Sequence, residues 1–149
     1  MSETTSQTPC EEFPQGIPTI RVVAMPTDTN PGGDIFGGWL VSQMDLAAGT
    51  VAASRANGRC ATVAINNLTF LKPVVVGDEV SIYTNITHTG RTSLKIHVQT
   101  WRRARDTHVT SKVTEGEFVF VALTDKHQPR PIPPLSTKEE LHDSCNTTI

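Results

Sequence analysis

The residue that most strongly suggests chemistry in this sequence is an acid inside an apolar stretch. Residues 32–53 read GGDIFGGWLVSQMDLAAGTVAA, with Asp45 near their middle. At helical spacing Asp45 shares a face with Val41, Ala48 and Ala52, where a carboxylate loses hydration and needs hydrogen-bond donors or a cation. Asp45 is therefore a candidate general base or nucleophile. A surface acid paired with a strand Arg or Lys is the alternative, and the apolar surroundings disfavour it.

A pair of glycines stands where this helix should begin. Gly37 and Gly38 would leave backbone N–H groups unobstructed at the positive end of the helix dipole, where a carbonyl oxygen or an oxyanion could bind. A simpler interpretation is that the glycines allow close packing and that Asp34 caps the helix. For two adjacent glycines taken alone, that simpler interpretation is favoured.

The spacing of these groups predicts an assembly. Gly37 and Asp45 are eight residues apart, which is about 12 Å along an α-helix, too far for both to touch one carbonyl group. If they act together, they come from different chains. Two such helices packed antiparallel about a twofold axis would place each helix start beside the partner's Asp45, which predicts a homodimer with two composite sites.

The rest of the chain predicts the elements that position these residues. Helical spacing runs from Gly38 to about Asn57, and β-prone segments surround it in the order β-α-β-β-β-β. We expect an α+β fold in which a long antiparallel sheet wraps the central helix, because so apolar a helix needs cover on most sides. The expected strands cover 20–25, 60–71, 79–88, 93–103 and 109–123.

The two ends of the sequence differ from its middle. Residues 1–18 are rich in Ser, Thr, Pro and Glu and are expected to form a flexible leader, so the domain should cover 19–124. Residues 125–149 form a Pro-rich tail, in which Ser136 and Glu139 could make a capping box.

Composition narrows the class of protein. The 149 residues carry a formal net charge of -2 without a long basic run, so nucleic acid is not an expected partner. No segment approaches the roughly 18 apolar residues of a membrane span, and no secretion signal is apparent. The three cysteines are far apart, which fits a reducing cytoplasm and offers neither a disulfide framework nor a zinc site.

Seven short motifs, in order, carry a resemblance to a known family. Together they resemble hotdog-fold acyl-CoA thioesterases of the YciA-like branch, over about residues 20–133. The motifs are VVAMP (22–26), DTN (28–30), GDIFGGW (33–39), SQMDL (42–46), TFLKPV (69–74), VGD (76–78) and GRTSLK (90–95).

The resemblance implies a hotdog domain that hydrolyses fatty acyl-CoA without a cofactor or metal. It implies that Asp45 is the general base or nucleophile, that the amide of Gly37 or Gly38 polarises the thioester carbonyl, and that Asp34 lies near the reacting group. It also implies that dimers assemble further, as a trimer of dimers.

The resemblance further implies where CoA binds. Arg91 and Ser93 of the GlyArgThrSer turn would face CoA, with Thr92 beside them, and a guanidinium at a hairpin suits bidentate phosphate binding. Lys72 could reach a phosphate as a point charge, although a Lys before Pro at a strand end is commonly only solvated.

Two other functions remain open from the sequence. A hydratase or dehydratase acting on acyl thioesters would need a His placed to move protons, and none of the five histidines precedes or lies within the helix. A non-catalytic acyl-CoA sensor would be expected to lack the acid or carry an effector domain, whereas this chain has Asp45 and room for one domain.

Overall fold

A computed structural model describes residues 13–135 of the chain. The proposed capping box at Ser136 and Glu139, two of the three cysteines and most of the expected leader lie outside the described residues. The elements follow in the order expected from the sequence. They are β1 (Ile20–Val23), the short 3-10 helix η1 (Pro26–Asp28), α1 (Gly37–Ala56), β2 (Cys60–Phe70), β3 (Glu79–Thr89), β4 (Ser93–Arg103) and β5 (Thr110–Ala122).

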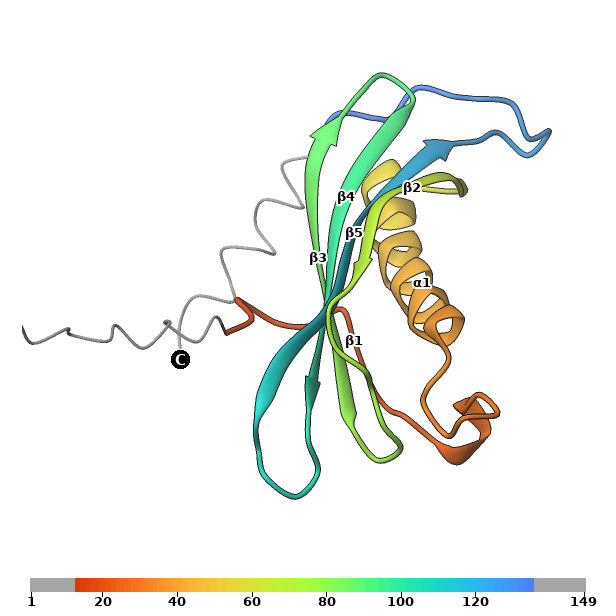
Figure 1. Cartoon of the computed structure of the whole chain (residues 1–149). Helices are drawn as coiled ribbons and strands as arrows, with labels where there is room; N and C mark the ends of the chain where they lie inside the picture. Colours follow the sequence, from red (N-terminus) through yellow and green to blue (C-terminus); the bar gives the residue numbers. More distant parts are fainter. Residues whose placement is uncertain (1–12, 136–149) are drawn as a thin grey trace, which may run out of the picture.

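The strands form one antiparallel sheet, and α1 packs across one of its faces (Figure 1). The strand order is β1-β3-β4-β5-β2, so β1 and β2 form the two edges. This is the α+β hotdog arrangement that the sequence predicts. The strand ends agree to within two residues, because Pro, Gly and charged turns interrupt each alternating segment.

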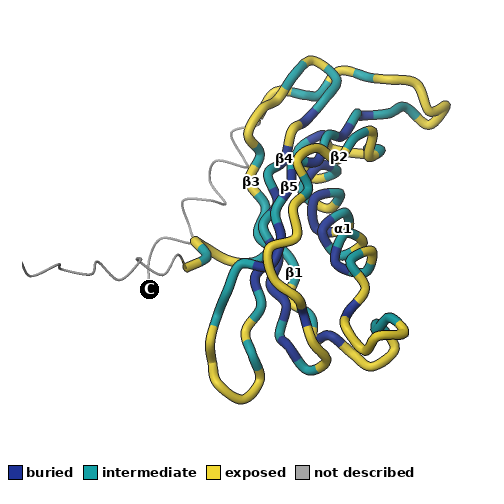
Figure 2. The backbone as a smooth tube through the Cα atoms, in the orientation of Figure 1, coloured by how far each residue is buried: buried dark blue, intermediate teal, exposed yellow. Residues whose placement is uncertain are grey.

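The hydrophobic core lies between α1 and the inner face of the sheet (Figure 2). Small residues of the helix allow this close approach, since a Cβ on Gly49 would already touch the Phe120 ring at 3.6 Å. The largest fully buried apolar side chains are Phe118, Met44, Ile82, Leu94, Ile96, Val74, Val80, Val98 and Val113.

The sheet leaves one side of the helix open to solvent. The sheet buries Met44, Ala48 and Ala52 completely, but the side chain of Leu46 on another side of α1 is 56% exposed. The sheet of one chain therefore wraps one side of α1 and leaves the side of Leu46 uncovered. The apolar residues remaining on α1 are free to meet another surface.

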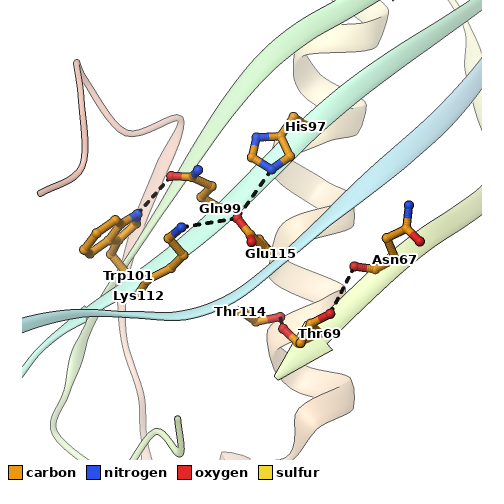
Figure 3. A network of polar contacts seen from close by, with 8 residues as sticks. All are labelled: Asn67, Thr69, His97, Gln99, Trp101, Lys112, Thr114 and Glu115. Carbon is orange, nitrogen blue, oxygen red and sulfur yellow. Dashed lines mark hydrogen bonds and ion pairs between the residues drawn. The ribbon is translucent and has the colours of Figure 1, made fainter. Parts of the chain in front are cut away.

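A bend in β2 brings the end of this strand over the start of the helix. The register with β5 shifts between Asn66 and Thr69, and Asn67 has a left-handed backbone with φ 53°. Thr114 on β5 donates its hydroxyl to the Thr69 carbonyl at 2.7 Å, which closes the irregular stretch (Figure 3). Phe70 follows directly and ends the strand.

The outer face of the sheet carries a separate polar network (Figure 3). The Glu115 carboxylate on β5 lies 3.5 Å from His97 Nε2 and 3.3 Å from Lys112 Nζ. Trp101 donates its indole N–H to the Gln99 side chain at 3.2 Å. These groups face away from α1 and stabilise the surface opposite the helix.

Backbone hydrogen bonds fix the loop that leads into α1. Ile35 donates its N–H to the Val74 carbonyl at 3.2 Å, which ties this loop to the β2–β3 connection. That connection is held by Asp78, which is 2% exposed and accepts hydrogen bonds from Val75 N–H and from the Arg102 guanidinium, both at 3.0 Å. A buried carboxylate with two donors thus holds the helix entrance in place.

We expect Asp78→Ala to destabilise the protein strongly, because it leaves the Arg102 guanidinium and the Val75 N–H without their acceptor. Removing one partner of a buried ion pair typically lowers the free energy of unfolding by about 3–5 kcal/mol. Urea unfolding followed by circular dichroism measures this change. Asp106→Ala, at an exposed loop acid, is the control and should shift the midpoint little; equal midpoints for the two variants would contradict the role of Asp78.

Candidate active site

The start of α1 presents backbone donors that nothing else uses. The N-cap residue is Phe36, and no side chain caps the helix. Within residues 13–135, the amides of Gly37 and Gly38 donate no hydrogen bond, whereas Trp39 and Leu40 donate to the Phe36 carbonyl. Two free amides at the positive end of a helix are suited to hold a carbonyl oxygen or an oxyanion.

Asp34 does not cap the helix, so the simpler interpretation of this residue is wrong. Asp34 is exposed in the loop before α1, where its N–H donates to the Asn30 side chain at 3.1 Å and its carbonyl accepts from Asn30 N–H at 2.7 Å. In the described part of the chain its carboxylate makes no hydrogen bond or ion pair. Its carboxylate is therefore available near the helix start.

A pocket of about 300 Å³ opens beside Gly37. Its wall includes the Phe70 ring, whose nearest atom lies 3.2 Å from where a Cβ on Gly37 would be, so only glycine fits at this contact without displacing the ring. Most of its lining residues are apolar and one is a cation, a combination that suits an apolar chain with a polar end. Its lining residues are Ile35, Gly37, Leu40, Phe70, Leu71, Lys72 and Pro73.

Asp45 lies on the half-buried side of α1 and has one donor. Thr62 of β2 donates its hydroxyl to Asp45 Oδ1 at 2.6 Å. Among the described residues no Lys, Arg or His forms an ion pair with Asp45, so the alternative of a structural salt bridge is wrong. One carboxylate oxygen is held and the other remains available to accept a proton or attack a carbon.

Thr62 is the residue of this site that the sequence analysis missed. It stands in an ordinary β-prone segment, 17 residues after Asp45. Only the packing of α1 on β2 brings the two side chains together, so no local pattern identifies Thr62.

The turn expected to bind CoA lies at the opposite end of the helix. Arg91 and Thr92 occupy the β3–β4 hairpin, closed by a hydrogen bond from Gly90 N–H to the Ser93 carbonyl at 2.8 Å. The Arg91 side chain is exposed and, within the described residues, its guanidinium makes no hydrogen bond or ion pair. Figure 1 shows this hairpin near the C-terminal end of α1.

One chain therefore does not bring all of the candidate residues together. Lys72 lines the pocket beside Gly37, whereas Asp45 is about 12 Å farther along the helix. The turn at Arg91 lies beyond the far end of a helix whose 20 residues span about 30 Å. The free amides at Gly37, the Asp45 carboxylate and the Arg91 guanidinium therefore lie at three different positions along the length of α1.

Three further features of the described residues concern metal ions, membranes and thiol chemistry. Residues 13–135 contain no group of three or more His, Cys, Asp or Glu side chains that could hold a metal ion. No helix among them is long and apolar enough to cross a membrane. Burial raises the pKa of the Cys60 thiol, with Arg130 acting in the opposite direction, so Cys60 has little thiolate character near neutral pH.

The sequence matches a protein-family model and curated relatives. The thioesterase superfamily model matches residues 32–107. The chain is 47% identical over 133 residues to an uncharacterized acyl-CoA thioester hydrolase of Zymomonas mobilis, covering 89% of each protein. It is 42% identical to the acyl-CoA thioester hydrolase YciA of Escherichia coli K12, covering 80% of this chain and 93% of YciA.

The fold also matches solved structures. The crystal structure of HI0827, a hexameric broad specificity acyl-coenzyme A thioesterase, superposes with a TM-score of 0.80 at 38% identity and covers 90% of this chain and 92% of that one. A hexameric thioesterase from Yersinia pestis gives a TM-score of 0.78 at 42% identity, covering 83% of this chain and 100% of that one. The chain therefore belongs to the thioesterase superfamily, in the YciA-like branch of hotdog-fold acyl-CoA thioesterases.

Proposed function

We propose that the protein hydrolyses acyl-CoA thioesters to a carboxylic acid and free CoA, as the names of its relatives state for them. The observation that carries this proposal is the pair of free amides at Gly37 and Gly38, which open beside an apolar pocket. An acyl thioester joins an apolar chain to a polarisable carbonyl, and this arrangement accommodates both parts.

The amides of Gly37 and Gly38 act on the carbonyl oxygen. As a nucleophile adds to the carbonyl carbon, negative charge develops on that oxygen, and N–H donors already in place stabilise it. Losing one such donor in other enzymes costs about 2.7–4 kcal/mol of transition-state stabilisation. The acyl chain lies in the pocket lined by Leu40 and Phe70.

Asp45 supplies the second half of the reaction. As a general base, it takes a proton from water while the oxygen of that water attacks the carbonyl carbon, the C–S bond breaks and the CoA thiolate leaves to be protonated. As a nucleophile, its free oxygen forms a mixed anhydride and expels the thiolate, and water then hydrolyses the anhydride. Thr62 orients the carboxylate in either course. Asp34 stands three residues before Gly37 and would help to orient water or the carbonyl.

Asp45 must come from a second subunit, because about 12 Å along α1 separates it from the donors of its own chain. The free edge of β2 supports such a dimer: β2 is 11 residues long and, among the strands of residues 13–135, pairs only with β5. Apolar side chains beside this edge are open to solvent, with Val63 at 57% and Ile65 at 38% exposure. We infer that two copies join here with antiparallel helices and that dimers assemble into a trimer of dimers, since both solved relatives described above are named hexameric.

An antiparallel pair of helices also explains the placement of the CoA contacts. The start of one α1 then lies toward the end of its partner, so Gly37 and Lys72 of one subunit approach Asp45 and the Arg91 turn of the other. Arg91 binds a CoA phosphate in a bidentate manner, Thr92 and Ser93 contribute hydroxyls, and Lys72 adds a point charge.

Asp45→Asn should lower kcat for acyl-CoA hydrolysis by about 10²-fold or more, because the amide neither accepts a proton nor attacks the carbonyl. Free thiol release from short, medium and long acyl-CoAs measures activity, and thermal shifts by CoA verify that binding persists. Asp106→Asn is the matched control. Full activity of Asp45→Asn would overturn the assigned role, and a wild type inactive on all chain lengths would favour an acyl-CoA sensor.

Arg91→Ala should raise KM for acyl-CoA by about 10-fold and leave kcat nearly unchanged, because the lost contact involves a remote phosphate. The increase should shrink at high salt, where exposed charges are screened. Arg105→Ala, at an exposed loop arginine, serves as the control. An unchanged KM in Arg91→Ala would exclude this turn as the phosphate contact.

Ile65→Lys should convert the assembly to monomers and abolish hydrolysis, because a charge at the β2 edge opposes pairing with a second copy. Light scattering after size-exclusion chromatography measures the mass, and circular dichroism verifies the fold. Val109→Lys, at a loop side chain that is 59% exposed, should leave the assembly intact. A monomer that retains full activity would refute the composite site.

A further inference from the structure

The segment after β5 folds back across the end of the helix. We call this segment, residues 124–133, the strap. It begins with a turn in which Thr124 N–H donates to the Gln128 carbonyl at 2.8 Å, and it returns so that Arg130 N–H donates to the Ala122 carbonyl at 2.9 Å. In Figure 1 the blue chain runs from the end of β5 to the β3–β4 hairpin.

Arg130 fastens the strap to the end of α1. Its guanidinium donates to the Leu123 carbonyl at 2.9 Å, to the Ala56 carbonyl at 2.9 Å and to the Arg59 carbonyl at 3.5 Å. Ala56 is the last helical residue, so one of these bonds satisfies a carbonyl that has no partner within the helix. The forked guanidinium can reach three acceptors at once, which an ammonium on a flexible stem cannot reproduce.

Gly58 makes this contact possible. A Cβ at this position would lie 2.7 Å from Arg130 Nη2, closer than real Cβ contacts occur. The Arg130 side chain therefore occupies space that the Cβ of any residue other than glycine at position 58 would fill.

The other end of the strap holds the turn that carries Arg91. Ile132 N–H donates to the Arg91 carbonyl at 2.8 Å, and the Ile132 side chain packs against the core. Thr92 is held from β5, where Ala122 N–H donates to its carbonyl at 2.9 Å. Arg55 of the helix also binds the strap, through the Pro133 carbonyl at 2.7 Å. The backbone of the turn is thus fixed from one side while the Arg91 guanidinium remains exposed.

We propose that Arg130 is a positioning residue for CoA: by locking the strap to the helix end it holds the Arg91 turn in the geometry that meets a phosphate. This inference rests on the proposed binding of CoA by Arg91. Within residues 13–135 the hydrogen bonds of the Arg130 side chain all go to backbone carbonyls, at the end of α1 far from Gly37. Its influence is therefore confined to the nucleotide end of the substrate and acts by preorganisation of the turn.

The test compares two substrates that share the reacting bond. Acyl-CoA carries the nucleotide phosphates, and the matching acyl-pantetheine thioester does not. We expect Arg130→Ala to raise KM for acyl-CoA by about 5- to 10-fold with kcat within about twofold, and to leave both constants for acyl-pantetheine unchanged. The thermal shift produced by CoA alone should shrink in parallel.

Two further variants separate geometry from charge. Arg130→Lys keeps the charge without the fork, so it should show most of the rise in KM. Arg105→Ala removes an equal charge at an exposed loop arginine outside the strap and should behave as wild type. If Arg130→Lys keeps the wild-type KM, the charge at this position is the cause and the inference fails.

A second pair tests the strap if Arg130→Ala does not fold. Ile132→Ala and Ile132→Pro both lose the apolar side chain, but only proline lacks the N–H that reaches the Arg91 carbonyl. We expect a larger KM for acyl-CoA in Ile132→Pro than in Ile132→Ala, and equal values would overturn the inference. Losses that are the same for acyl-CoA and acyl-pantetheine would show a merely structural role. If the wild type is inactive on both substrates, the proposed function is refuted. The thermal shift produced by CoA, compared between the wild type and the strap variants, would then still test whether the strap positions the CoA contact.

Discussion

The structure depends on one constraint, namely that α1 carries apolar residues on more sides than five strands can cover. The sheet buries Met44, Ala48 and Ala52, and small residues along this face let it approach closely. Leu46 on another side stays open to solvent, as do Val63 and Ile65 beside the free edge of β2. Because exposed apolar surface adjoins an unpaired strand edge, the single chain is well suited to pair with a second copy.

The same constraint explains why the candidate residues are spread along the helix. A straight rod about 30 Å long cannot bring its first turn, its middle and its last turn to one point. In the proposed dimer, an antiparallel second helix would place its own middle and end beside the first turn, so the separation of these residues within one chain suits a site shared by two. An acyl-CoA molecule is itself long, with the thioester at one end and the nucleotide phosphates at the other. Its binding therefore requires contacts that are far apart along the helix.

Local patterns in the sequence were sufficient to predict the order of elements, the strand ends and the helix that carries Gly37 and Asp45. Alternation and turn residues are properties of adjacent positions, and the resemblance added the fold. The contacts between Thr62 and Asp45, and between Phe70 and Gly37, could not be predicted because they join residues 17 and 33 positions apart. The bulge at Asn67 turns Phe70 toward the helix, and no feature of this β-prone segment predicts it. From composition alone the strap is only a Pro-rich tail. No local pattern predicts that Arg130 donates a hydrogen bond to the Ala56 carbonyl.

The absence of a side-chain cap at the start of α1 is itself consistent with catalysis. Ser, Thr, Asp or Asn at the N-cap would typically stabilise a helix by about 0.5–2 kcal/mol relative to Ala, yet Phe36 occupies this position. A capping oxygen would accept hydrogen bonds from the first amides, which are the donors that a thioester oxygen needs. The loop is instead fixed by backbone bonds from Ile35 to Val74 and from Phe36 to Asp28, so its geometry does not depend on a cap. Within residues 13–135 the amides of Gly37 and Gly38 thus remain fixed in place and unpaired, and in the proposed reaction they would bind the charge that develops as the thioester is attacked.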